Sequence, residues 1–191
     1  MEAFLIYNPS VVNPLMIETP RLLLRPMSFR DAKRLFEIYR DPETIRYWNG
    51  PDTSQQDSEE RIARMQTHWE RHGYGDWALI DKKTEAMIGF CGLHLFEGMD
   101  EINLGFLIDR TFWGKGLATE ASMASLRFGF EKAPLGRVVG TTAPNNAGAI
   151  KVLKKCGMSY WKEIIRNGPR SIFQITGNDW SRYTRSRQEK F

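Results

Sequence analysis

The chain has 191 residues, 41% of them hydrophobic and 26% charged, so it can bury the core of one domain and keep a solvated surface. Its net charge of +4 is spread along the chain and suits an anionic ligand, without the dense basic stripe or base-stacking motif that would indicate nucleic acid. No apolar run reaches the length of a transmembrane helix, and the N-terminus, with Glu2 and two Asn-Pro breaks, does not fit a signal peptide, so we expect a cytoplasmic protein with no membrane partner.

Composition divides the chain into three parts. We expect residues 1–17 to form an irregular N-terminal arm, residues 18–184 to form one domain, and residues 185–191 to form a polar, frayed tail. The arm can pack on the body of the domain or on a second subunit. A monomer and a homodimer therefore both stay open.

The first half of the domain predicts a strand, two helices and a hairpin. Residues 21–25 predict a short strand, and a capping-box sequence then begins a helix that ends before Pro42. A second helix is predicted over residues 57–72, with apolar residues on one side only. Residues 77–80 and 87–93 read as the two strands of a hairpin, and two glycines inside the second strand indicate a bulge or a close backbone approach.

A glycine turn between a strand and a helix is the centre of the chain. Residues 102–108 predict a buried strand, residues 113–116 contain two glycines, and a helix of small residues is predicted from Leu117 to about Phe130. Such a turn presents unpaired backbone N–H groups at the positive end of a helix dipole, so it can hold an anion. The dinucleotide fingerprint is incomplete because Thr119 stands at its next glycine, and the P-loop ending is also missing. The glycines alone support a phosphate site and a purely structural turn equally.

The last third of the domain predicts three strands and a short helix. The strands are expected over residues 137–142, 158–166 and 170–176. Asn146 begins the helix, and Gly157 fits the left-handed position after its end. With hairpins at both ends and one strand-helix-strand crossover between them, the order of elements predicts an α/β (α+β) domain of three layers, with a central, mixed and mostly antiparallel sheet.

The cysteine and histidine residues give no metal site. Cys91 and Cys156 lie in apolar segments, which indicates buried free thiols in a reduced compartment. His68 and His72 are four residues apart on a predicted helix, but a metal site there would lack a third ligand. A solvated helix face is the favoured interpretation, and we expect no metal.

Several segments together resemble the GNAT N-acetyltransferases. Residues 104–109 and 112–121 resemble the acetyl-CoA loop of this family, closest to the branch of the ribosomal-protein N-terminal acetyltransferases. Residues 146–158 resemble the second signature of the family, and residues 18–26 resemble the first strand of that branch. The resemblance covers Glu18 to Asp179 and implies a GNAT-like fold with acetyl-CoA as co-substrate.

The resemblance also implies how the cofactor binds. The pyrophosphate would lie on the backbone of the glycine turn, where Lys115 adds a positive charge, and the pantetheine amides would pair with the edge of the preceding strand. Asn146 would hold the pantetheine arm from the other side, or would only cap its helix. The expected cofactor-binding residues are Phe106, Ile108, Gly114, Lys115, Gly116, Leu117, Ala118, Thr119 and Asn146.

At three positions that often carry catalytic groups in relatives, this chain has residues without those groups. Ala149, Leu153 and Asn103 stand where relatives have Ser, Tyr and Glu. Glu101 lies two residues before Asn103, on the same face of the strand. Glu101 and Asn103 are therefore the candidate catalytic residues, with Glu101 as a base acting through water; an exposed turn acid is an equally supported interpretation of Glu101. Positioning of the reactants alone can supply ~7–11 kcal/mol, so a missing acid need not abolish activity.

The sequence leaves the acceptor open. Tyr47, Trp48 and Trp69 either line an acceptor pocket or are ordinary core and surface aromatics. We expect an N-acetyltransferase in which a primary amine, of a protein N-terminus or a small molecule, attacks acetyl-CoA directly in a ternary complex. An acyl-CoA-binding module that has lost catalysis is the alternative.

Overall fold

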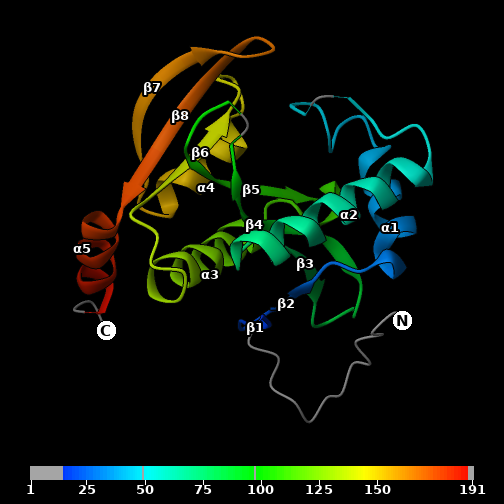
Figure 1. Ribbon diagram of the computed structural model, residues 1–191, viewed down its shortest axis with the longest axis horizontal. Coiled ribbons are helices and arrows are strands. Elements are labelled where there is room, and N and C mark those ends of the chain that lie inside the picture. Colours follow the sequence, from blue (N-terminus) through cyan, green and yellow to red (C-terminus); the bar gives the residue numbers. More distant parts are fainter. Residues whose placement is uncertain (1–14, 49, 97, 189–191) are drawn as a thin grey trace.

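The computed structural model describes residues 15–48, 50–96 and 98–188, and these build one eight-stranded sheet with the order β1-β2-β3-β4-β5-β6-β8-β7 (Figure 1). The strands are β1 (Ile17–Glu18), β2 (Leu22–Pro26), β3 (Asp76–Asp81), β4 (Met87–Leu95), β5 (Ile102–Ile108), β6 (Arg137–Thr142), β7 (Ser159–Ile165) and β8 (Pro169–Thr176). The helices are α1 (Ala32–Tyr39), α2 (Gln55–His72), α3 (Leu117–Glu131), α4 (Ala147–Lys155) and α5 (Gly177–Gln188), with short turns η1 (Phe29–Asp31) and η2 (Arg110–Phe112).

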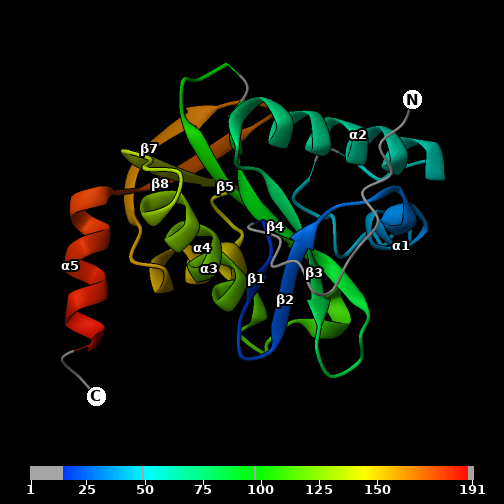
Figure 2. The ribbon, with the colours of Figure 1, turned by 60° about the horizontal axis from the view of Figure 1, so that its bottom comes forward.

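The sheet has an apolar cluster on each face, because successive side chains of a strand point to opposite sides. Trp77 and Leu79 of β3 belong to the cluster that packs against α3 and α4. Ala78 and Ile80 of the same strand belong to the cluster that packs against α1 and α2 (Figure 2). The predicted three-layer α/β class with a mostly antiparallel sheet is confirmed.

Gly89 shows why the predicted hairpin needs a glycine inside β4. Its φ is +150°, and the register between β3 and β4 shifts opposite it, at Leu79 and Ile80. A Cβ atom at Gly89 would collide with the carbonyl oxygen of Leu107 on β5. The predicted bulge and close backbone approach are both present at this position.

The sheet opens at a seam between β5 and β6. All other neighbouring strands are antiparallel, whereas β5 and β6 are parallel and only Asn103 and Val139 are in register. The crossover between these strands runs through the glycine turn and α3, so β5 continues toward the turn without a partner strand on its β6 side.

The structure corrects one predicted helix boundary and adds one helix, and both corrections involve reciprocal capping hydrogen bonds. Helix α2 begins at Gln55, because Ser54 and Asp57 exchange side-chain and backbone hydrogen bonds. Helix α5 was not predicted. Thr176 and Asp179 bond each other in the same reciprocal way at its start.

The chain ends also differ from the expected arm and tail. Residues 185–188, assigned to a frayed tail, are helical in α5, which Trp180 anchors by stacking on Phe130 with ring centroids 5.6 Å apart. Residues 189–191 lie outside the described residues, as does most of the expected arm, residues 1–14. The last residue of that arm, Ile17, pairs with Leu24 in the sheet.

Candidate active site

The glycine turn has the geometry of an anion site. Gly114 and Gly116 have φ of +76° and +78°, a conformation that side-chain-bearing residues rarely adopt. Gly116 is the N-cap residue of α3 and offers no side-chain cap, so the N–H groups of the first helical turn face outward without one. The space beside Gly114 is open, and Leu117 anchors the helix start with 4% exposure. The turn therefore fits the pyrophosphate of a nucleotide-like cofactor.

An ion pair that sequence reasoning missed braces this turn. Arg21 of β2 donates to the carbonyl oxygen of Lys115 at 2.7 Å and to the carboxylate of Glu120 at 2.6 Å. Glu120 also accepts from the hydroxyl of Thr19 at 2.7 Å. Burial alone raises the pKa of Glu120, but these hydrogen bonds and the charge of Arg21 outweigh burial and hold the pKa below its usual range. Because these partners lie far apart in the sequence, no local sequence pattern predicts their contact.

The side chain of Lys115 contacts the segment before the turn, and its predicted charge on the phosphate stays a prediction. Its Nζ donates to the carbonyl oxygen of Thr111 at 3.0 Å and lies 4.8 Å from the ring centroid of Phe112. The backbone of Lys115 remains part of the turn. Ala118 and Thr119 lie in the first turn of α3, directly after the glycine turn.

The predicted strand-edge residues differ in their surroundings. Phe106 lines a cavity at the seam, which we call the main cavity because residues of β4, β5, β6, α4 and the β7–β8 hairpin all contribute to its wall. Ile108 does not line it, and its carbonyl oxygen already accepts a hydrogen bond from the indole of Trp113 at 2.6 Å. The part of the β5 edge that is open to the cavity thus lies nearer Phe106.

The main cavity has a volume of about 380 Å³ and is walled by both sides of the seam. Phe106 comes from β5 and Thr142 from β6, while Asn146, Ala149 and Leu153 come from α4. Asn146 caps α4 by accepting from the backbone N–H of Ala149 at 3.1 Å, so the capping interpretation holds and the side chain still borders the cavity. Ala149 and Leu153 supply no acid there.

Segments far apart in the sequence close the cavity. The hydroxyl of Tyr47 donates to the carbonyl oxygen of Asn145 at 3.3 Å, and Arg170 of β8 donates to the carbonyl oxygen of Tyr47 at 3.2 Å. Trp48 lies beside them, 37% exposed and edge-on to Phe90. Tyr47 and Trp48 therefore line the cavity, and its role as an acceptor pocket stays a prediction.

Trp69 belongs to the core instead. Its ring packs edge-on against Trp77 and Phe128, and its indole N–H donates to the carbonyl oxygen of Asp76 at 2.9 Å. The interpretation of Trp69 as an ordinary core aromatic is therefore confirmed.

The structure separates the two candidate catalytic residues. Glu101 forms an ion pair with Arg137 of β6 and does not line the cavity. Asn103 does line it, and its side chain bonds His94 of β4 and the backbone N–H of Thr141. His94 was missed because its register partner, Asn103, lies on another strand.

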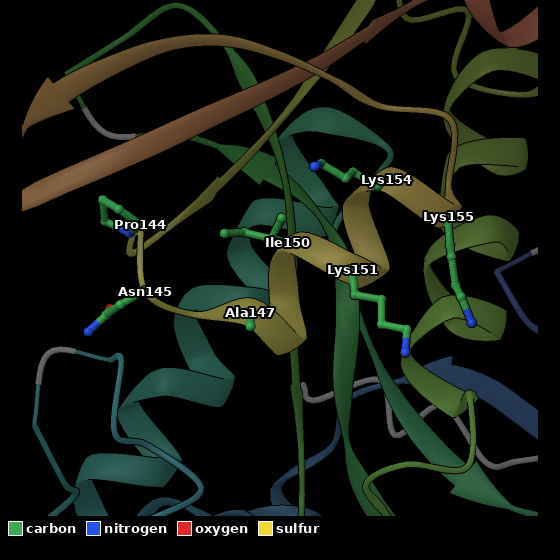
Figure 3. Close-up of a pocket in the computed structure, with 7 residues that line it drawn as sticks. All are labelled: Pro144, Asn145, Ala147, Ile150, Lys151, Lys154 and Lys155. Carbon is green, nitrogen blue, oxygen red and sulfur yellow. The ribbon is translucent and has the colours of Figure 1, made fainter.

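A second cavity of about 530 Å³ runs along α4 (Figure 3). Pro144 and Ile150 give it an apolar floor, and three lysines surround it. Figure 3 shows Lys151 and Lys155 extending in one direction and Lys154 in another, as their helical spacing requires.

The remaining polar groups form no metal site within the described ranges, where no three His, Cys, Asp or Glu side chains gather as ligands. The rings of His68 and His72 lie against each other at a tilt of 40°, with ring centroids 4.5 Å apart. Both cysteines are free and buried, as expected, and burial raises the pKa of Cys91 to about 12, so it is no nucleophile. None of the helices in the described part of the chain is long and apolar enough to cross a membrane.

Comparison with known proteins gives a consistent result. The sequence profile of the acetyltransferase (GNAT) domain matches residues 21–159. The Bacillus subtilis protein YkkB is 31% identical over 160 residues, which are 82% of this chain and 92% of YkkB. The N-acetyltransferase p20 of Bacillus licheniformis is 30% identical, over 76% of this chain and 82% of its own length.

A solved structure shows the same fold. The ribosomal-protein-S5-alanine acetyltransferase from Vibrio fischeri superposes with a TM-score of 0.71 at 17% identity, covering 86% of this chain and 98% of that one. The profile and the relatives indicate an acetyltransferase, and the solved structure has the same fold. The chain belongs to the GNAT acetyltransferase family and is an N-acetyltransferase.

Proposed function

We propose that the chain moves an acetyl group from acetyl-CoA to a primary amine that enters the cavity at the seam, with both substrates bound at once. One observation carries this proposal: the glycine turn and the unpaired edge of β5 lie on one continuous crossover, and that edge leads into the cavity. When bound, acetyl-CoA supplies an activated thioester. The protein supplies position, which is worth ~7–11 kcal/mol in well-oriented reactions.

Each part of the site would hold a different part of acetyl-CoA. The backbone N–H groups from Gly114 to Ala118, at the positive end of the α3 dipole, would bind the pyrophosphate. The edge of β5 near Phe106 would pair with the pantetheine amides, and Asn146 borders the same cavity from α4. The side chain of Lys115, which donates to the carbonyl oxygen of Thr111 in this structure, would add a positive charge beside the phosphate.

The cavity favours an acceptor that carries a negative charge beside its amine. Arg166 and Arg170 of the β7–β8 hairpin line it, and the lining contains no Asp or Glu among the described residues. Guanidinium groups bind carboxylates in a bidentate way. We therefore rank an amino acid or an acidic peptide N-terminus above a polyamine, which the two arginines would repel.

The ribosomal-protein N-terminal acetyltransferases are one class of enzyme that would fit such an acceptor, a peptide N-terminus. The support for it is the resemblance of the glycine loop and the fold shared with the Vibrio fischeri enzyme. Identity of 17% to that enzyme carries only the fold, so the acceptor follows from the lining of the cavity rather than from the relative's name.

The test is free-thiol release from acetyl-CoA with a panel of acceptors, run beside calorimetry of acetyl-CoA binding. The panel holds peptides that begin with Ala or Ser and continue with acidic or basic residues, free amino acids and polyamines. Release stimulated by acidic peptides or amino acids supports the proposal. Micromolar binding without release from any acceptor would instead favour an acyl-CoA-binding module, and absence of both would make the glycine turn purely structural.

A further inference from the structure

A row of polar side chains crosses the sheet on the face that is otherwise covered by α1 and α2. Asp76 of β3, His94 of β4 and Asn103 of β5 lie side by side, and the row ends at the backbone N–H of Thr141 on β6. The Oδ1 atom of Asp76 is 3.2 Å from Nδ1 of His94, and Nε2 of His94 is 3.1 Å from Nδ2 of Asn103. The Oδ1 atom of Asn103 accepts from Thr141 N at 3.1 Å.

The order of donors along this row fixes the tautomer of His94. A backbone N–H can only donate, so Thr141 must face the oxygen of Asn103 and the NH₂ group of Asn103 must face His94. The Nε2 atom of His94 therefore accepts and carries a lone pair. Its Nδ1 carries the proton and donates it to Asp76.

The strands are shaped to admit this row. A Cβ atom at Gly105 of β5 would lie 2.5 Å from Cε1 of His94, so only glycine leaves room for the imidazole. A Cβ atom at Gly92 of β4 would collide with the backbone of Gly75 and Asp76. These two glycines bring His94 and Asp76 within hydrogen-bond distance.

The row also lies where a base is needed. His94 and Asn103 both line the main cavity, whereas Glu101 is paired with Arg137 outside it. We propose that the Asp76–His94 pair accepts the proton of the acceptor amine, and that Asn103 is a positioning residue that keeps Nε2 of His94 unprotonated until the amine arrives. This inference rests on the proposed function.

The proton balance is simple. The ammonium form of the acceptor gives one proton to Nε2 of His94, and the hydrogen bond from Asn103 breaks. The neutral nitrogen then forms the C–N bond with the acetyl carbon while the C–S bond breaks, and the second nitrogen proton goes to solvent as the thiolate leaves. Deprotonation by a positioned base adds a factor of about 10²–10⁴ in rate.

The charges around His94 oppose one another. Burial lowers its pKa, but the charge and hydrogen bond of Asp76 outweigh burial and raise it. The NH₂ group of Asn103 works against the imidazolium, because a protonated Nε2 would face another donor. From α2, His68 and its neighbour His72 add positive charge when protonated; burial lowers the pKa of His68. Across the cavity stand Arg166 and Arg170.

The experiment combines the pH dependence of kcat/KM for the acceptor with an NMR titration of the His94 imidazole, because both report on the free enzyme. His94→Gln should lower kcat/KM by about 10²–10⁴-fold and remove the acidic limb of the profile. Its acetyl-CoA affinity by calorimetry should stay within about twofold. His72→Gln, on the exposed end of α2, is the matched control and should keep the limb.

Two further variants give shifts of opposite sign that a merely structural role would not produce. Asn103→Asp places a carboxylate beside Nε2, so the NMR pKa and the acidic limb should both move up by roughly 1–3 pH units. Asp76→Asn removes the charge at Nδ1, so both should move down. Asp76 and Asn103 are both 7% exposed, so the folding of each variant is checked by circular dichroism, and the shift in either folded variant decides the matter.

The outcomes separate this inference from the function on which it rests. An acidic limb that survives in His94→Gln, or that fails to follow the NMR pKa in Asn103→Asp, overturns the role of His94 while amine acetylation stands. No amine-dependent turnover by the unmodified chain overturns the proposed function and the role of His94 together.

Discussion

In the proposed function, the two sides of the seam bind their ligands by different means. On the α3 side the proposed binding groups are backbone N–H groups of one continuous segment, held by two glycines with positive φ. On the other side the cavity is closed by side chains from the α1–α2 connection, α4 and the β7–β8 hairpin. The first side can recognise a phosphate in any sequence that keeps the glycines. The second side depends on particular residues, so choice of acceptor can change without loss of the fold.

The largest effect should follow from a change on the backbone side. Gly116→Ala forces a Cβ atom into a φ of +78°, which costs ~1–2 kcal/mol and brings a side chain to the phosphate position. We expect acetyl-CoA affinity to fall about 5–30-fold by calorimetry. Gly136→Ala is the control, because a Cβ atom there meets open space and no positive φ is involved. Equal affinities of the two variants would contradict a backbone phosphate site.

A change on the side-chain side should be nearly as large but selective. Arg170→Ala removes a cation from the cavity lining, and a hydrogen bond to a charged group is worth about 1.5–3 kcal/mol. Because Arg166 remains in the lining, we expect the low end of this range: KM for a carboxylate-bearing acceptor should rise about tenfold, with KM for acetyl-CoA unchanged. Arg127→Ala, an exposed change on α3, should alter neither constant. If KM for a polyamine rises as much as KM for the acidic acceptor, charge recognition by Arg170 is excluded.

A smaller effect should come from the brace between β2 and the glycine turn. The pKa of Glu120 lies below the ordinary 4.5 in the folded protein, so its stabilisation is present above pH 4.5 and is lost as pH falls through the lowered pKa. Glu120→Gln should reduce the free energy of unfolding at pH 7 and weaken its decrease at acidic pH, as measured by denaturant unfolding. We expect acetyl-CoA affinity to fall about threefold, under 1 kcal/mol. If the free energy of unfolding decreases at acidic pH as steeply in this variant as in the unmodified chain, Glu120 does not link protonation to folding.

The smallest effect tests the closure of the cavity. Tyr47→Phe removes one exposed hydrogen bond to Asn145, of 3.3 Å, and keeps the ring. Exposed bonds of this kind contribute little, so kcat/KM for the acceptor should change less than about threefold. Tyr47→Ala, which also removes the ring from the cavity wall, should change it more. Similar values for both variants would mean that the ring plays no part in acceptor binding.

The same division explains what the sequence could predict. Strand β5, both turn glycines, α3 and the Asn146 cap of α4 are local, because each is encoded by periodicity or by turn and capping chemistry within a few residues. Helix α5 was equally local and could have been found from the Thr176–Asp179 capping box. Strand β1 could not, since two residues carry no period.

The missing site residues are non-local. Arg21 and Glu120 are 99 positions apart, and Glu101 meets Arg137 only because parallel strands start at the same edge. His94 and Asn103 become neighbours through the register of β4 and β5. Spacing in the sequence placed Glu101 and Asn103 on one face of a strand, but only the fold shows that one is paired outside the cavity and the other borders it.

The seam has a further consequence for how the sheet can grow. With one register pair between β5 and β6, the β5 amides that follow Asn103 on that side have no strand to bond, although they lie inside a sheet and not at its rim. An extended, amide-bearing chain laid into this gap completes the ladder as an added strand would, in the manner of β-augmentation. In hydrogen-exchange experiments, these amides should be the ones in β5 that gain most protection when acetyl-CoA is present. An internal gap also escapes the edge-to-edge aggregation that an open outer strand invites.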